Sequence, residues 1–145
     1  MADVSLKAYL AALVDRRWRP GALDCGVFMA DWVRLVRGVD PIADVRGSYS
    51  TEREFRRILR REGGFVNSCA VRLARAGYAP TEAPAAGDLA IVLAPFAVRG
   101  GKILRRPTGA ICVSEKLRAV MTSDLGVVIA DNKLLPVIKA YHHNG

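Results

Sequence analysis

The spacing of apolar side chains predicts helices in the first half of the chain. Apolar residues in 4–15 and again in 24–37 recur every three or four positions, which is the spacing of one helix face. Asp24 can cap the first turn of the second segment, and Gly38 can end it. We therefore expect a helix over each range.

Two further helices are expected along the chain. Thr51 and Glu54 have the spacing of a capping box, which predicts a helix over residues 51–62 before a Gly-Gly pair. The segment 67–77, "NSCAVRLARAG", has helical apolar spacing and ends in glycine. Residues 39–50 are rich in turn formers and are expected to form a loop.

The pattern then changes to short runs rich in β-branched residues, separated by Gly, Asp and Asn turns. The runs are "DLAIVLA" at 88–94, "GAICVS" at 109–114, "RAVMTS" at 118–123, "GVVIAD" at 126–131 and "VIKAY" at 137–141. They predict an antiparallel sheet of about five strands. N-terminal helices packed on a C-terminal sheet define an α+β fold, and residues 1–145 have the length of a single domain.

Composition and charge narrow the function classes. A chain with 51% hydrophobic and 25% charged residues is typical of a folded protein, and Pro95 interrupts its longest apolar stretch, so no membrane span is expected. The net charge is +8. The only dense basic run carries Arg53, Arg56, Arg57, Arg60 and Arg61. It is either a solvated helix face or a site for an anionic partner, and because no aromatic residues interleave for stacking, nucleic acid is not the expected partner.

The cysteines indicate free thiols. Cys25, Cys69 and Cys112 are odd in number and widely spaced, and no CxxC motif is present. This pattern argues against a disulfide framework and against a zinc site. We expect no metal and no cofactor.

Cys25 has two interpretations. At the start of a helix, backbone N–H groups stabilise negative charge and can lower the pKa of a thiol, and the preceding turn can present the N–H of Cys25 as an oxyanion donor. Cys25 is then a nucleophile. A lone cysteine on an apolar helical stripe is, however, also a common core residue. Position alone leaves both roles open.

The motifs around Cys25 resemble a known family. "DCGVF" at 24–28 and "GDLAIV" at 87–92 stand in the order found in NlpC-type cell-wall cysteine peptidases, which have a papain-like fold. The resemblance implies that Cys25 occupies the nucleophile position, with Asp24 as the helix cap. It also implies peptidoglycan as a possible partner.

A closer resemblance is to small phage- and prophage-encoded relatives of these peptidases. It rests on "WRPGALDCGVFMADWVRLVRGVDPIADVRGSYS" at 18–50, "EGG" at 62–64 and "GAICVS" at 109–114. These relatives imply a structural component of the tip or hub of a phage or phage-like tail. The expected partners are tail-tip and hub proteins. The expected location is the virion, after synthesis in the cytoplasm of the host bacterium.

One position departs from the peptidase pattern. Aligning "TGAICVS" with the "HVGIYVG"-like strand of that family places Thr108 where the histidine base belongs, and threonine cannot take a proton from a thiol. The only histidines, His142 and His143, follow the last expected strand. We therefore expect a catalytically degenerate scaffold. The alternative is an active peptidoglycan-cleaving cysteine endopeptidase in which His142 or His143 reaches Cys25.

Overall fold

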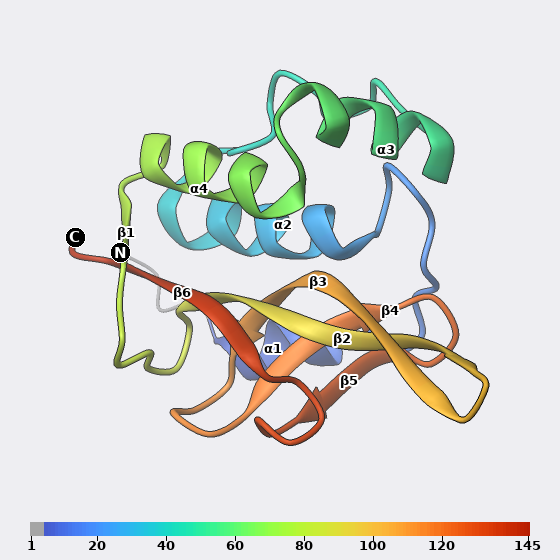
Figure 1. Cartoon of the computed structure of the whole chain (residues 1–145). Helices are drawn as coiled ribbons and strands as arrows, with labels where there is room; N and C mark the ends of the chain where they lie inside the picture. The colour runs from blue at the N-terminus through green and yellow to red at the C-terminus, as the bar shows by residue number, and fades with distance from the viewer. Residues whose placement is uncertain (1–4) are drawn as a thin grey trace.

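The computed structural model describes residues 5–145, which form an α+β domain of three layers (Figure 1). Over these residues the helices are α1 Leu6–Ala11, α2 Cys25–Arg37, α3 Glu52–Arg61 and α4 Phe65–Arg75. The strands are β1 Tyr78–Pro80, β2 Leu89–Arg99, β3 Lys102–Cys112, β4 Arg118–Thr122, β5 Gly126–Ala130 and β6 Val137–His143. Helix α2 lies between the sheet and the pair α3–α4.

The helix boundaries follow local capping. Helix α2 begins after Asp24 and ends at Gly38, which has the left-handed backbone that glycine favours, as predicted. At α3, the Thr51 hydroxyl accepts a hydrogen bond from the Glu54 N–H (3.1 Å), which confirms the capping box. Helix α1 is shorter than predicted because the chain enters a series of turns after Ala11; residue 4 of the prediction lies outside the described residues.

The described residues form one antiparallel sheet of six strands in the order β1-β6-β2-β3-β4-β5, one more than the five runs that the sequence indicated. Each expected run contains a strand. The missed strand, β1, is only three residues long and exists because it pairs with the end of β6. Its residues have no periodicity that a sequence pattern could detect.

The hairpin β2–β3 is much longer than predicted. Pro95 interrupts the apolar run, but it lies at a bulge and beyond the part of β2 that pairs with β6. Pro107 lies on β3, before the part of that strand that pairs with β4. A proline costs little at such an edge, where no ladder partner needs its missing N–H. The tip is Gly100-Gly101 with positive φ at both residues, as two-residue hairpin turns require. The Gly-Gly pair between two runs with β-branched residues is the sequence feature from which this long hairpin could have been predicted.

The two faces of the sheet carry different cores. Phe28, Met29 and Trp32 of α2 pack with Ile91 and Ile111 in the cluster under the helices. A second core cluster of small and branched side chains lies on the opposite face of the sheet. It consists of Ala90, Val92, Ala94, Ala110, Cys112, Val120, Leu135 and Ala140. The first cluster positions the N-terminal end of α2 over β3.

Candidate functional site

The turn before α2 is organised by the carboxylate of Asp24. One oxygen accepts the N–H groups of Gly26 (2.9 Å) and Val27 (2.8 Å), and the other accepts the N–H of Gly21 (2.9 Å) and the hydroxyl of Tyr49 (2.6 Å). Asp24 is only 1% exposed. The predicted helix cap is therefore also a buried junction between the turn, α2 and the loop that precedes α3.

Cys25 lies against β3 with its sulfur buried. A Cβ atom at Gly109 would lie 2.8 Å from the Cys25 carbonyl oxygen and 2.5 Å from the end of the Met29 side chain. The absence of a side chain at Gly109 therefore allows the start of α2 to pack closely against β3. Burial, and then the charge of Asp24, raise the pKa of Cys25 to about 12, although the Gly109 N–H and Arg106 act in the opposite direction. At neutral pH the thiol form is therefore favoured over the thiolate. Cys25 is held as a neutral thiol.

Two adjoining hollows meet at Cys25, and together we call them the Cys25 groove. Both are bordered by Trp18, Cys25 and Arg106. Thr108 borders the first hollow, where its hydroxyl donates to the Arg106 carbonyl (3.2 Å). Glu52 borders the second and lies 3.9 Å from the Arg106 guanidinium. The structure thus brings Thr108 and Cys25 to one groove, where Thr108 supplies no base.

The two histidines belong to β6 rather than to a tail after the last strand, which corrects the expected strand end at residue 141. His142 Nδ1 lies 2.7 Å from Asp88 Oδ1. The His143 ring packs edge-on against Tyr78, with 5.1 Å between ring centroids. Asp88 also accepts the N–H of Ala85, so it caps the turn before β2.

Neither histidine reaches Cys25. The Cys25 sulfur lies beside Gly109 of β3. His142 is held at Asp88, whose backbone carbonyl accepts the N–H of Cys112 at the C-terminal end of β3. Gly109 on β3 and His142 on β6 are separated by three residues along the strand direction and by two strand spacings across the sheet. Their backbones therefore lie about 14 Å apart. Within residues 5–145 no histidine borders the Cys25 groove, so the Cys-His dyad that the endopeptidase alternative requires is absent from it.

A titration of thiol reactivity checks the state of Cys25. We expect its reaction with a thiol reagent to keep rising above pH 10, because the neutral form dominates below that pH. The rate assigned to Cys25 is the difference between the native protein and Cys25→Ser. Unfolding in urea provides the control, since all thiols should then show an ordinary midpoint of about 8.5. A native midpoint below that value would contradict the neutral thiol.

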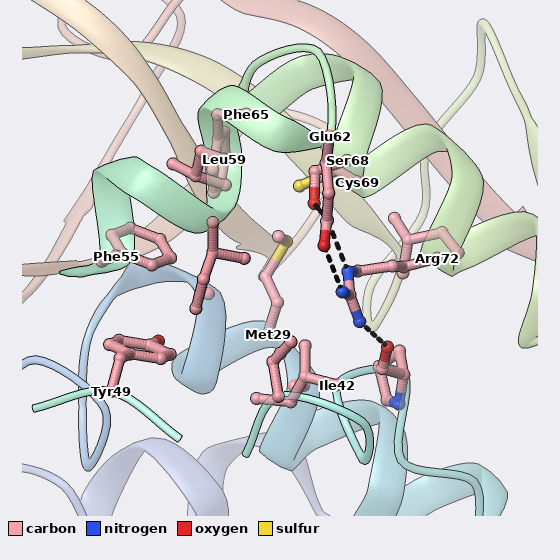
Figure 2. Close-up of a pocket in the computed structure, with 16 residues that line it drawn as sticks. Met29, Ile42, Tyr49, Phe55, Leu59, Glu62, Phe65, Ser68, Cys69 and Arg72 are labelled. Carbon is pink, nitrogen blue, oxygen red and sulfur yellow. Dashed lines mark hydrogen bonds and ion pairs between the residues drawn. The ribbon is translucent and has the colours of Figure 1, made fainter. Parts of the chain in front are cut away.

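Beneath α3 lies an apolar cavity, shown in Figure 2. Tyr49 and Phe55 stack at one end, with 5.1 Å between ring centroids, and Met29 of α2 points into the space between them and α4. At the other end Arg72 and Glu62 form an ion pair of 2.6 Å. Sequence reasoning missed this cavity because its wall combines three helices and the loop 39–50.

The five arginines of the basic run all lie exposed on α3, which forms the outer layer of the molecule (Figure 1). The only ion pair that the described residues form with them is Glu52–Arg56 at 3.8 Å. The inner side of the helix is apolar, with Ile58 buried and Phe55 and Leu59 partly buried. The arginine stripe, Arg53, Arg56, Arg57, Arg60 and Arg61, is therefore available to a partner.

The described residues contain neither a metal-binding cluster nor a membrane-spanning helix. No group of three or more His, Cys, Asp or Glu side chains within residues 5–145 is arranged to hold a metal ion. In that same range, every helix is too short or too polar to span a bilayer. Cys69 and Cys112 are buried free thiols, as is Cys25.

Comparison with protein families returns one assignment. Residues 2–141 match the family described as "Domain of unknown function (DUF6950)". The chain belongs to this family. The DUF6950 domain includes the helical layers, the sheet and the Cys25 groove. Searches of curated proteins and of solved structures found no match to the DUF6950 chain.

Proposed function

We propose that the protein is a catalytically silent module on an NlpC-like peptidase scaffold and serves as a structural component of a phage or phage-like tail tip or hub. The observation that carries the loss of catalysis is the burial of Cys25 in a groove that no histidine of residues 5–145 borders. Papain-like chemistry needs a thiolate paired with a base. The tail assignment rests on the resemblance of residues 18–50 to small phage-encoded proteins.

The assignment to a tail is tested on assembled particles. Particles induced from the source bacterium are purified, and the protein is quantified by mass spectrometry against the tail hub protein. A fixed ratio to the hub across independent preparations is the expected result. Complete absence from intact particles would contradict the tail role, whatever the state of Cys25.

The arginine stripe is the surface that we assign to the tail partner, because five exposed arginines on one helix favour an acidic surface. Reversing Arg53, Arg57 and Arg60 to glutamate should lower incorporation, or affinity for the isolated hub, on the order of tenfold to a hundredfold. The matched control reverses three exposed basic residues elsewhere: Arg17, Lys116 and Lys133. An equal loss in both triple variants would mean that net charge, not the stripe, controls docking.

A second candidate function, a peptidoglycan-cleaving cysteine endopeptidase, is favoured by one observation: Cys25 begins α2 at the floor of a groove, beside the Gly109 N–H. The test is release of stem-peptide fragments from purified peptidoglycan by the native protein and by Cys25→Ser. Release that requires Cys25 would establish the hydrolase. Equal or no release would exclude it on that substrate.

A further inference from the structure

Arg118 is a buried cation without an acidic partner. It is 3% exposed, and among residues 5–145 its guanidinium donates only to the carbonyls of Ser114 and Glu115, both at the long distance of 3.3 Å. Its Nε is buried without a hydrogen-bond partner, and no carboxylate of residues 5–145 lies within 4 Å of the guanidinium. A guanidinium has five N–H donors, and burying it without an anion is costly.

Arg118 borders a hollow that shares no lining residue with the Cys25 groove. Arg118 pairs with Cys112 on β3 and, by strand alternation, shares the face of Val120 and the second core cluster. We call this space the Arg118 hollow; its other polar borders are Thr81, Glu82, Asn132 and Lys139.

The charges and donors of the hollow favour an anion. Buried Arg118 and exposed Lys139 contribute two positive charges, and exposed Glu82 contributes one negative charge. The Thr81 hydroxyl accepts the N–H of Ala83 (3.2 Å), which leaves its own hydrogen free to donate.

We propose that the Arg118 hollow binds a small dianionic oxyanion, either a phosphate group or a dicarboxylate. Such a group supplies the acceptors that the buried guanidinium lacks, and Arg is the side chain best shaped for bidentate binding of either anion. Binding would involve no covalent step. The proposal is independent of the tail role, because it concerns a different face and none of the residues of the arginine stripe.

The test is titration of the full-length protein with sodium phosphate and, separately, with sodium succinate, at ionic strength held constant with chloride. Amide and arginine Nε resonances report the binding site by NMR. We expect saturable shifts centred on Arg118, Thr81 and Asn132 with at least one of the two anions, and the anion that saturates identifies the ligand chemistry. Shifts that do not saturate with either, or that centre elsewhere, would overturn the proposal.

Single-residue variants distinguish anion binding in the Arg118 hollow from a general effect of the protein's positive charge. Lys139→Ala should weaken binding roughly twofold to fivefold, whereas Lys133→Ala, an exposed lysine outside the hollow, should leave it unchanged. Arg118→Met should abolish binding. If Arg118→Met does not fold, the pair of lysine variants still decides, because equal affinity in Lys139→Ala and Lys133→Ala would exclude the hollow as the site.

Discussion

Asp24→Ala is expected to lower the free energy of unfolding by about 3–5 kcal/mol, because charged hydrogen bonds contribute about 1.5–3 kcal/mol each and their loss is not additive. Four donors lose their acceptor at once: the N–H groups of Gly21, Gly26 and Val27 and the hydroxyl of Tyr49. The site is almost fully buried, so water cannot replace the carboxylate. Urea unfolding measures the change as a lower midpoint at unchanged slope.

Two control variants separate the contributions of individual hydrogen bonds to this loss of stability. Asp24→Asn keeps one amide oxygen for the N–H groups of Gly26 and Val27, so it should lose about half as much as Asp24→Ala. Tyr49→Phe removes a single donor and should cost about 1 kcal/mol. If Asp24→Ala costs no more than Tyr49→Phe, the carboxylate is not the junction that its contacts indicate.

Arg72→Met is expected to cost about 3 kcal/mol, because it leaves a carboxylate partly buried without its cation. Arg72 is 8% exposed and joins three parts of the fold. It pairs with Glu62 at the end of α3 (2.6 Å) and with Asp44 in the loop 39–50 (2.6 Å), and donates to the Pro41 carbonyl (3.0 Å). Methionine preserves the apolar stem, so the loss isolates the guanidinium contacts. Arg72→Lys should be intermediate, since lysine keeps the charge but not the fork of donors.

The loss of stability in Arg72→Met is also expected to depend on pH. Hydrogen bonds from Arg72 lower the pKa values of Glu62 and Asp44 below their ordinary 4.5 and 3.8. A carboxyl with a lowered pKa in the folded state stabilises the protein above its ordinary pKa, and that stabilisation is lost as pH falls. The difference in unfolding free energy between the native protein and Arg72→Met should therefore be full at pH 7 and shrink below about pH 4.5. A difference that stays constant down to pH 3 would contradict the ion-pair explanation.

The features that could be predicted from the sequence are those set by neighbours in the chain. Asp24 caps α2, Gly38 ends it, and Thr51 with Glu54 caps α3, because each of these groups bonds within its own turn. The strand-rich second half was also predicted, since alternation and β-branched residues are local properties. The same reasoning failed at β1, which exists only because β6 lies beside it.

The candidate site was predictable only in part. Helical spacing placed Cys25 at the start of a helix, the family resemblance placed Thr108 at the position of the base, and both residues border the Cys25 groove. It could not predict the state of the thiol, because helix position alone suggests a lowered pKa, whereas burial in the folded protein and the charge of Asp24 raise it. Nor could it assign His142 to Asp88, a contact between residues 54 positions apart.

The sequence by itself determined the caps of α2 and α3, the change from helices to strands along the chain and that a cysteine follows a capping aspartate, since these depend on interactions within a few residues. Only the tertiary structure decided that Cys25 is buried, that both histidines belong to the other end of the sheet and that Arg72 joins three segments. Burial and charge pairing are sums over atoms brought together by folding, so no local pattern encodes them.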